Sequence, residues 1–308
     1  MTELSLHGHR AIVTGAGRGI GRAHALELAG RGAAVVVNDV DRASADSVVA
    51  QIVEGGGTAV ASYTPVGTRA AGEEIVTRAI DELGGIEIVV NNAGFLRPAL
   101  FEDMSDDQLR QVLDVHLMGS IYVTQAAWKT MKAQQYGRVV LTSSSAAMFG
   151  LQGQANYCAA KAGTFGLMKA LSYEGASYGI RVNALLPYAA SAITDQDPIP
   201  NIADEYARYI DAELGAKLAG ANREPERVSP MMLYLASPAC ELTGEAFSIC
   251  AGRYARVVVG VTEGWLAPSD EVVSGESVIE HLEQINALDT LRTPAVMYEE
   301  VADVAGRL

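Results

Sequence analysis

The sequence predicts an α/β protein built on a doubly wound parallel sheet. Apolar runs that end in turn residues alternate with helical patterns along most of the chain. A glycine-rich turn follows the first apolar run, and an acidic residue, Asp39, ends the second. Alternating strands and helices are typical of a parallel sheet covered on both faces, and right-handed crossovers then favour the doubly wound topology.

Six segments have the composition of buried strands bounded by turn residues. They are residues 10–17, 33–39, 86–94, 137–145, 180–187 and 245–252. Helical patterns lie between them, at residues 20–31, 73–83 and 104–132 and around Tyr157. The chain therefore has the repeated strand–helix–strand order of a parallel sheet.

The order of elements predicts one domain over residues 1–263, followed by a C-terminal extension over residues 264–308. Residues 195–230 interrupt the alternation, because they are rich in acidic residues and contain Pro198, Pro200, Pro225 and Pro230. This segment follows the carboxyl end of a strand, where such sheets bind ligands, so we interpret it as a mobile substrate loop with short helices. The extension has one helical pattern, near residues 274–286, and we expect it to pack on the domain or on a neighbouring subunit.

The composition excludes several classes of protein. Of the 308 residues, 49% are hydrophobic and 19% are charged, which is ordinary for a globular protein. The formal net charge is -14 and the isoelectric point is about 4.8. Nucleic acids and anionic membrane surfaces attract the opposite charge, so we expect neither as a partner.

Cysteine usage and the termini point to a reducing compartment. The three cysteines, Cys158, Cys240 and Cys250, are odd in number and form no metal-binding motif, so we expect neither a disulfide framework nor a metal. The N-terminus has no apolar signal core, no run is long enough to span a membrane, and the chain does not end in the usual peroxisomal tripeptide. We therefore expect a cytoplasmic protein.

The turn "VTGAGRGIGRA" has the features of a phosphate-binding loop. Gly15, Gly19 and Gly21 permit a tight turn and a close approach of the backbone to a pyrophosphate. The helix that follows offers free N–H groups and the positive end of its dipole. A strand–helix turn without a ligand is the alternative, but the strand before, the helix after and Asp39 together favour a dinucleotide.

Asp39 bears on the choice of dinucleotide. It ends the strand "VVVNDV" about 20 residues after the turn, where a carboxylate accepts hydrogen bonds from the adenosine ribose hydroxyls. The same carboxylate would repel a 2′-phosphate, and the nearest following arginine is Arg42. The sequence therefore favours NAD over NADP.

Tyr157 and Lys161 stand four residues apart in the helical run "GQANYCAAKAGTFG", so their side chains share one helix face. A nearby ammonium favours the phenolate and lowers the pKa of tyrosine, which suits a general acid/base. Ser144 ends a strand thirteen residues earlier and supplies a hydroxyl. Taken singly, the tyrosine could be a packing residue and the serine a turn former, but their combination with the glycine turn indicates catalysis.

These motifs resemble the short-chain dehydrogenase/reductase family. The resemblance rests on "TGAGRGIG", "NNAG", Ser144 and the Y-x-x-x-K motif "YCAAK", and it covers roughly residues 8–252. It implies a Rossmann-type fold in which Ser144 orients and polarises the substrate oxygen and Tyr157 is the general acid/base. It also implies that Lys161 lowers the pKa of Tyr157 and holds the nicotinamide ribose.

The same resemblance implies a set of NAD-binding positions. They are Gly15, Gly17, Arg18, Gly19, Ile20, Gly21, Asp39, Thr64, Val66, Asn92, Ala93, Gly94, Tyr157, Lys161, Pro187, Ala189, Ala190 and Thr194. Thr64 stands near the place of an adenine-contacting aspartate, and Tyr188 replaces the glycine that usually follows Pro187. His116 replaces an asparagine whose backbone carbonyl serves a proton relay, so it is a candidate relay position, with a packed helix histidine as the alternative.

Within the family, segments such as "VVVNDV", "NNAGFLR" and "GQANYCAAK" are similar to the dehydrogenase domain of peroxisomal multifunctional enzymes of type 2, also called 17β-hydroxysteroid dehydrogenases of type 4. The likeness implies NAD-dependent oxidation of a (3R)-hydroxyacyl-CoA to a 3-ketoacyl-CoA, with a steroid side chain or another bulky acyl group as a candidate. Two alternatives remain: a dehydrogenase of hydroxysteroids or other free secondary alcohols, and an NAD-binding regulator with vestigial catalysis.

Binding of a CoA thioester and assembly follow from the same likeness. Cations for CoA phosphates could come from the substrate segment, at Arg208, Lys217, Arg223 and Arg227, although a solvated helix face explains them as well. Members of the family form homodimers or homotetramers through two long helices, here residues 104–132 and the helix of Tyr157.

Overall fold

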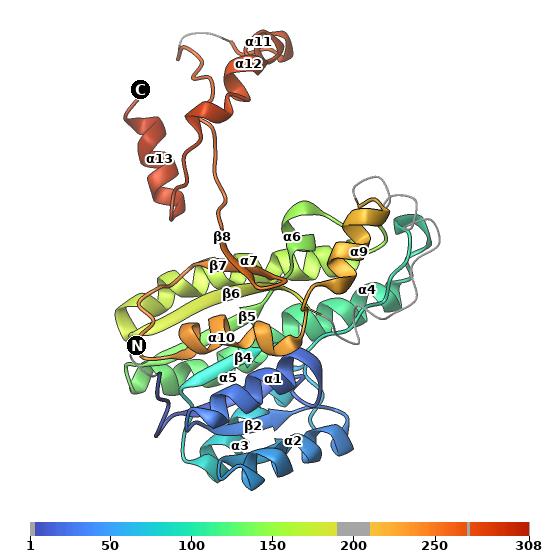
Figure 1. Ribbon diagram of the computed structural model, residues 1–308. Coiled ribbons are helices and arrows are strands. Elements are labelled where there is room, and N and C mark those ends of the chain that lie inside the picture. The colour runs from blue at the N-terminus through green and yellow to red at the C-terminus, as the bar shows by residue number, and fades with distance from the viewer. Residues whose placement is uncertain (1–3, 190–209, 270–271, 308) are drawn as a thin grey trace. The chain divides into compact units, whose positions relative to one another are not determined.

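The computed structural model describes residues 4–189, 210–269 and 272–307 (Figure 1). The chain divides into two compact units, Met1–Arg256 and Val257–Leu308. The expected boundary at residue 263 and the packing of the extension stay predictions.

A single sheet organises the first unit. Its strand order is β3-β2-β1-β4-β5-β6-β7-β8, and each pair from β3 to β7 is parallel. The strands are β1 (Arg10–Thr14), β2 (Ala34–Asn38), β3 (Thr58–Ser62), β4 (Ile88–Asn91), β5 (Gly137–Thr142), β6 (Ile180–Tyr188), β7 (Ala246–Cys250) and β8 (Arg253–Val257). This order confirms the predicted doubly wound fold. The chain first adds β2 and β3 on one side of β1, and then crosses over to add β4 and the later strands on the other side.

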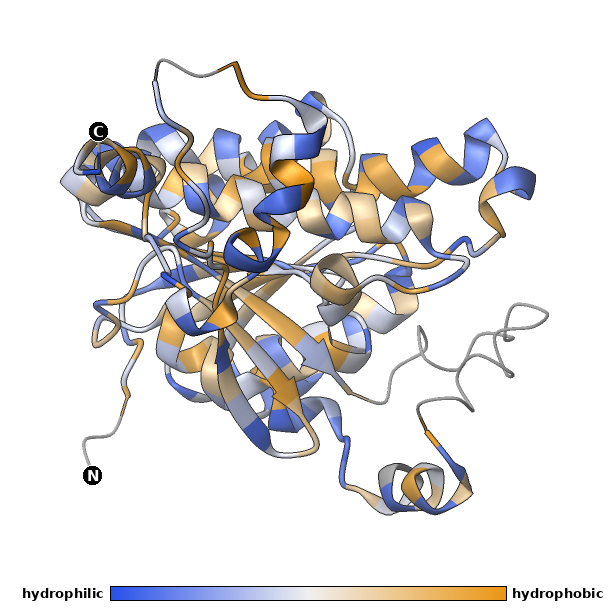
Figure 2. Ribbon diagram, turned by 90° about the horizontal axis from the view of Figure 1, so that it is seen from above, coloured by the Kyte–Doolittle hydropathy of each residue, from blue (hydrophilic) through white to orange (hydrophobic). Residues whose placement is uncertain are grey.

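Helices cover both faces of the sheet (Figure 1). On one face lie α1 (Gly19–Gly30), α2 (Arg42–Glu54) and α10 (Ser229–Ala236). On the other lie α3 (Arg69–Leu83), α5 (Gly119–Ala133) and α7 (Ala155–Gly175). Valines in the middle of β1, β2 and β4 are fully buried because both faces are covered, and Figure 2 shows the strands in hydrophobic colours between helices with polar outer turns.

The helix expected over residues 104–132 is continuous but irregular. It begins as α4 (Asp106–Leu113), passes through a π-helical turn (Asp114–Met118) and continues as α5. A capping box fixes its start, since the Ser105 hydroxyl accepts a hydrogen bond from the Gln108 N–H and the Gln108 side chain accepts one from the Ser105 N–H. The π-helical turn contains His116, which is buried.

Two strands escaped the sequence analysis. β3, "TAVAS", is short and alanine-rich, and it becomes a strand because it pairs in parallel with β2. β8, "RYARV", alternates polar and apolar residues at the sheet edge. Ala251 and Gly252 both have positive φ, as a type I′ turn requires, and this two-residue connection folds β8 back antiparallel beside β7.

The substrate segment lies partly outside the described residues, which omit 190–209. Its remaining part contains α9 (Ala212–Gly220), a 3₁₀ turn (Pro225–Arg227) and the beginning of α10. The short helices expected there are present. Other short elements are α6 (Ser145–Phe149) and the 3₁₀ turns Phe101–Asp103 and Ala176–Tyr178.

The second unit is held by its own contacts. Val261 and Arg292 exchange backbone hydrogen bonds of 2.9 and 2.8 Å, and the rings of Trp265 and His281 stack at 4.0 Å. The helix expected over residues 274–286 is two short helices, α11 (Gly275–Glu280) and α12 (Leu282–Ile285), interrupted at His281. The 3₁₀ turn Leu288–Thr290 and the helix α13 (Met297–Ala305) follow, and the sequence analysis did not predict α13.

Two further observations bear on the sequence analysis. All three cysteines are free thiols. In the part of the chain that the structure describes, no helix combines the length and the apolar character needed to cross a bilayer.

Candidate active site

The predicted site residues gather at the carboxyl edge of four neighbouring strands. The glycine turn follows β1, Asn92–Gly94 follow β4, Ser144 lies just after β5, and Pro187 lies near the end of β6. The carboxyl ends of parallel strands meet at one edge, and the reversal between β1 and β4 opens a crevice there. The fold therefore brings together groups that are far apart in the sequence.

The glycine turn requires residues without side chains at positions 15 and 21. Gly15 has a φ of +62°, and a Cβ on it would lie 2.7 Å from the Cα of Ala93. A Cβ on Gly21 would lie 2.0 Å from the carbonyl oxygen of Gly15 and 2.5 Å from the Nδ2 of Asn92. The turn, the first residues of α1 and the segment after β4 thus touch backbone to backbone.

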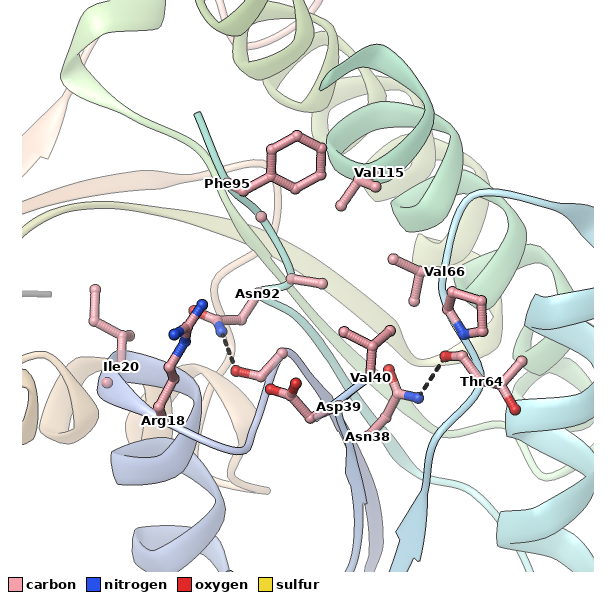
Figure 3. Close-up of a pocket in the computed structure, with 15 residues that line it drawn as sticks. Arg18, Ile20, Asn38, Asp39, Val40, Thr64, Val66, Asn92, Phe95 and Val115 are labelled. Carbon is pink, nitrogen blue, oxygen red and sulfur yellow. Dashed lines mark hydrogen bonds between the residues drawn. The ribbon is translucent and has the colours of Figure 1, made fainter. Parts of the chain in front are cut away.

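Thr14 and Asn92 lock this contact with hydrogen bonds. The Thr14 hydroxyl accepts from the N–H groups of Asn92 (3.0 Å) and Ala93 (3.1 Å). The Asn92 side chain donates back to the carbonyls of Thr14 (3.1 Å) and Gly15 (3.2 Å), the latter drawn in Figure 3. The "TGAG" and "NNAG" motifs therefore form one hydrogen-bonded unit.

A cavity of about 400 Å³ opens beside this unit. Figure 3 shows its lining, with Phe95 and Val115 toward one side and Arg18 and Asp39 toward the other. The lining residues are Gly15, Arg18, Gly19, Ile20, Asn38, Asp39, Val40, Thr64, Pro65, Val66, Asn92, Ala93, Gly94, Phe95 and Val115. Ten of the predicted dinucleotide positions are among them, and their role in binding a dinucleotide stays a prediction.

The chemistry of the cavity fits a dinucleotide. The helix α1 begins at the cavity, and no side chain caps its N-terminus. Its first N–H groups are therefore available to an anion. The carboxylate of Asp39 accepts hydrogen bonds from the N–H groups of Gly17 (2.9 Å) and Asp41 (3.0 Å). Gly17 has no room for a side chain, since a Cβ would lie 2.9 Å from Asp39 Oδ2.

The end of the cavity at Thr64, where the sequence analysis expects the adenine, has its own hydrogen bonds. The Thr64 hydroxyl donates a 2.6 Å hydrogen bond to Glu74, and the Thr64 carbonyl accepts a 2.9 Å bond from the Asn38 side chain. Asn38 is buried and also donates to Ser62, so it ties the end of β2 to the segment after β3. Thr64 and Val66 line the cavity, but the Thr64 hydroxyl is already engaged within the protein.

Lys161 is fully enclosed behind this edge. Its ammonium donates a 2.5 Å hydrogen bond to the carbonyl of Thr142, the last residue of β5. The helix α7 is held against the same strand end, because the Ser143 hydroxyl donates to the carbonyl of Lys161 (2.8 Å). Burial lowers the pKa of Lys161 from 10.5 to about 7.

Tyr157 is partly buried beside Lys161, whose Nζ lies 5.8 Å from the centre of the phenol ring. Burial raises the pKa of the phenol above its usual 10.0, and a hydrogen bond with Ser144 acts in the opposite direction. The expected lowering of the Tyr157 pKa by Lys161 is not among the causes in this structure. Burial also disfavours the charged form of Lys161 itself.

His116 links the cavity to the tyrosine. Its imidazole lies edge-on to the Tyr157 ring, with centroids 5.2 Å apart, and its Nε2 lies within hydrogen-bonding distance of the main chain of Phe95. Burial and, secondarily, the charge of Lys161 lower the pKa of His116 to about 3, while the hydrogen bond to Phe95 opposes them. The histidine is therefore a neutral, packed residue at neutral pH.

Asn156 was missed by the sequence analysis, although it precedes the tyrosine. It is 1% exposed, and its side-chain amide donates to the carbonyls of Arg97 (2.9 Å) and Gln108 (3.1 Å). Its Oδ1 accepts from the Tyr157 N–H (2.7 Å). Asn156 thus ties the first turn of α7 to α4 and to the segment after β4.

Other predicted positions lie outside the cavity lining. Gly17 packs against Asp39, and Gly21 packs against Gly15 and Asn92, so both belong to the turn without lining the cavity. Pro187 belongs to β6, which continues in extended form through Tyr188. Because Tyr188 is a strand residue, the conformational freedom of glycine is not needed there. Ala189 is buried in the core, and Ala190 and Thr194 lie outside the described residues.

The lining residues that the sequence analysis missed are Asn38, Val40, Phe95 and Val115. Each adjoins a predicted position, so the signal was adjacency to a motif, but their types alone carry no chemistry. Across the described ranges, no cluster of three or more histidine, cysteine, aspartate or glutamate side chains could hold a metal ion.

Comparisons with known proteins agree with this geometry. A family profile described as short chain dehydrogenase matches residues 9–198. Over 98% of its length the chain is 37% identical to peroxisomal multifunctional enzyme type 2 of Mus musculus, of which it spans 40%. Over 80% of its length it is 38% identical to a hydroxyacyl-CoA dehydrogenase of Mycobacterium tuberculosis, of which it spans 78%.

A solved structure extends the similarity to three dimensions. The full-length peroxisomal multifunctional enzyme type 2 of Drosophila melanogaster superposes with a TM-score of 0.79 at 31% identity. The match covers 99% of this chain and 50% of that one.

Burial of Lys161 predicts a pH-dependent stability of the ligand-free protein. Above pH 7 the unfolded chain binds a proton at Lys161 that the folded chain releases, so the free energy of unfolding rises with pH in that range. Relative to Lys161→Met, the wild type should gain about 1 kcal/mol per pH unit between pH 7 and 9 and level off below pH 7. Urea unfolding at several pH values measures this difference. Lys169→Met, on the same helix but less buried, is the control, and parallel curves for wild type and Lys161→Met would contradict the prediction.

Proposed function

The chain belongs to the short-chain dehydrogenase family, and on that basis we propose that it oxidises a (3R)-hydroxyacyl-CoA to the 3-ketoacyl-CoA with NAD. Enzymes of this family act on CH–OH donors, as do the hydroxyacyl-CoA dehydrogenases to which the chain is similar. The observation that carries the proposal is the convergence of Ser144, Tyr157 and Lys161 beside a cavity lined by a glycine turn and Asp39.

Tyr157 is the proposed base in the oxidation. Its phenolate takes the proton of the substrate hydroxyl, and the hydroxyl of Ser144, already hydrogen-bonded to the phenol, orients the same oxygen. Ser144 is held for this role at the start of α6, where its Oγ accepts a 3.1 Å hydrogen bond from the Ala146 N–H. Its single O–H donor, which favours the phenolate, is then shared with the substrate oxygen.

Bound NAD would accept the hydride from the carbinol carbon, and its positive nicotinamide ring would favour the phenolate of Tyr157. The residues proposed to hold it are the α1 N-terminus for the pyrophosphate, Asp39 for the adenosine ribose and Lys161 for the nicotinamide ribose. With a pKa of about 7, Lys161 has both of its protonation states accessible at neutral pH.

Asp39 supports NAD rather than NADP. Its carboxylate lines the cavity at 2.9 Å from the Gly17 N–H, and a 2′-phosphate placed there would meet a fixed negative charge. Arg42 lies with its guanidinium 4.3 Å from the centre of the Tyr63 ring, so it is already engaged by the aromatic face. Arg18 also lines the cavity and is the cation that works against this preference.

The thioester is supported by the names of the relatives and by one arginine. Of the four candidate cations, Arg208 lies outside the described residues and Lys217 is paired with Glu213 at 2.7 Å. The guanidinium of Arg227 lies against the β7–β8 turn. Arg223 lies 5.7 Å from the centre of the Tyr188 ring, at the carboxyl end of β6, so it is the cation that we assign to a CoA phosphate.

Two other functions are distinguished by a substrate panel. The panel holds (3R)- and (3S)-hydroxyacyl-CoA thioesters of short, long and steroidal acyl groups, together with free hydroxysteroids. NADH formation only from (3R)-thioesters supports the proposal, and activity only on free alcohols replaces it with a free-alcohol dehydrogenase. Tight NAD binding without turnover of any alcohol favours a regulator.

The assembly of the protein and its cellular compartment are also part of the proposal. A homodimer or homotetramer through α5 and α7 and a cytoplasmic location are the expectations from the sequence, whereas the multifunctional relatives are named as peroxisomal. Sedimentation of the purified protein tests the first, and imaging of the tagged protein in its host tests the second.

Replacing the base should abolish turnover without loss of structure. Tyr157→Phe is expected to lower kcat by about 10²–10⁴-fold, because it removes a general acid/base. Steady-state NADH formation measures the loss on the best substrate of the panel. Tyr173→Phe, on an exposed position of the same helix, should have wild-type kcat, and normal turnover by Tyr157→Phe would refute the assignment.

Removing the carboxylate of Asp39 should relax the choice of dinucleotide. Asp39→Ser is expected to lower the ratio of kcat/KM for NAD to that for NADP by about 10–100-fold, equivalent to about 1.4–2.7 kcal/mol. Asp46→Asn is the control, since Asp46 is bonded to the Tyr63 hydroxyl and does not line the cavity. An unchanged ratio in Asp39→Ser would mean that Arg18 or another group sets the preference.

Arg223 should matter only for the CoA part of the substrate. Arg223→Gln is expected to raise KM for a (3R)-hydroxyacyl-CoA about tenfold, since a charge-assisted hydrogen bond contributes about 1.5–3 kcal/mol. KM for the matching pantetheine thioester, which lacks the nucleotide phosphates, should not change. Lys217→Gln is the control, and equal effects of Arg223→Gln on both thioesters would exclude a phosphate contact.

A further inference from the structure

His116 occupies a place where the cofactor wall and the catalytic tyrosine come closest. It belongs to the π-helical turn between α4 and α5, and it is 1% exposed. Its neighbour Val115 lines the cavity, while the imidazole itself lies behind the lining, between the segment after β4 and the first turn of α7.

On the cavity side the imidazole holds the backbone of Gly94 and Phe95. His116 Nε2 lies 2.7 Å from the carbonyl oxygen of Phe95 and 3.1 Å from its N–H, so one tautomer donates and the other accepts. Gly94 packs on the ring so tightly that a Cβ would lie 2.1 Å from His116 Cε1. Both Gly94 and Phe95 line the cavity, so the imidazole supports the wall from behind.

On the other side the imidazole meets the acid/base. The rings of His116 and Tyr157 are perpendicular, with centroids 5.2 Å apart, which is a favourable edge-to-face arrangement. The main-chain carbonyl of His116 accepts a 2.7 Å hydrogen bond from the Ser120 hydroxyl. This bond holds the backbone at His116. The contacts with Phe95 and Tyr157 are made by the imidazole and would be lost with it.

One nitrogen of the His116 ring lowers the stability of the folded protein. His116 Nδ1 is buried and has no hydrogen-bonding partner among the described residues. A buried polar atom without a partner destabilises the folded protein, so an apolar side chain of similar shape would suit stability at least as well. The contacts of the ring with the two functional segments give a reason for keeping the imidazole.

We propose that His116 is a positioning residue whose imidazole sets the separation between the Gly94–Phe95 wall of the cofactor cavity and the phenol of Tyr157. The inference rests on the proposed role of Tyr157 as the acid/base, and it assigns to the side chain a task distinct from any relay through the main-chain carbonyl. Proton and hydride transfer depend steeply on such separations, since a displacement of about 1 Å can cost about 10²-fold in rate.

The first test compares His116→Ala with a matched variant. His116→Ala is expected to lower the plateau value of kcat at least tenfold, while the Kd of NAD changes less than threefold. His24→Ala is the control, because His24 is an equally buried histidine whose Nε2 is also without a partner among the described residues. Its Nδ1 lies 2.9 Å from the Ser229 hydroxyl on α10. The control should lower the melting temperature as His116→Ala does and leave kcat within twofold of wild type.

The pH profile separates positioning from a general loss of stability. Burial raises the pKa of Tyr157, and its titratable neighbours are Lys161, Cys158 and His116 itself. Loss of the imidazole admits water to the phenol, which lowers the pKa, so the rise of kcat with pH should shift to lower pH in His116→Ala. In His24→Ala the profile should not shift.

A second variant guards against misfolding of the first. His116→Gln keeps an amide that can bond to the Phe95 main chain but lacks the ring, so it should lose less activity than His116→Ala and shift the profile in the same direction. Gly94→Ala displaces the ring from the cavity side. Its effect on kcat should be large in wild type and at most threefold in the His116→Ala background, because the two variants disturb one contact.

The outcomes are distinguishable from a failure of the proposed function. If Tyr157→Phe is inactive while His116→Ala and His116→Gln both keep plateau kcat within twofold of wild type, the positioning role is refuted and the acid/base assignment stands. A raised Kd of NAD with unchanged kcat would also refute it, since His116 would then shape only the wall. If Tyr157→Phe remains active, the proposed function itself fails.

Discussion

The close approach of Gly21 to the carbonyl of Gly15 and the side chain of Asn92 is the constraint on which the site depends. Because Gly21 has no Cβ, the start of α1 can lie directly against Gly15 and against Asn92, which follows β4. Thr14 and Asn92 then lock the two motifs together through four hydrogen bonds between side chain and backbone. As a result, the N-terminus of α1 and the residues Ala93 and Gly94 face one cavity. Ser144, one of the proposed catalytic residues, follows β5, which is the neighbour of β4 in the sheet.

Most of the fold could be predicted from the sequence, because runs such as "AAVVVND" and "GRVVLTSSS" can be stable only when buried on both faces. The two missed strands had no such signal. β3 owes its conformation to pairing with β2 rather than to its alanines, and β8 is an edge strand returned by a two-residue turn. The expected helix near residue 281 is divided at His281, whose ring stacks on Trp265, a contact that no local pattern contains.

The positions of the candidate site residues were more predictable than the electrostatics of the site. Spacing placed Tyr157 and Lys161 on one helix face and Ser144 beside them, and the structure has this arrangement. The sequence suggested that Lys161 would lower the pKa of Tyr157, but the depth of Lys161 depends on β5 and α7 packing together, so its own pKa falls instead. Asn156 and Phe95 were missed because their importance lies in hydrogen bonds to segments that are distant in the chain.

The π-helical turn at Asp114–Met118 has a consequence for the whole of α4. Each residue of an α-helix advances the chain by 100°, and a π-helical turn accommodates one residue more than an α-helical turn would. The turn therefore changes the rotation of α4 about the helix axis relative to α5. The helix α5 packs on α3 and the sheet, while α4 presents the Gln108 carbonyl to Asn156. A chain shortened by one residue here would keep both helices and lose their common orientation around the tyrosine.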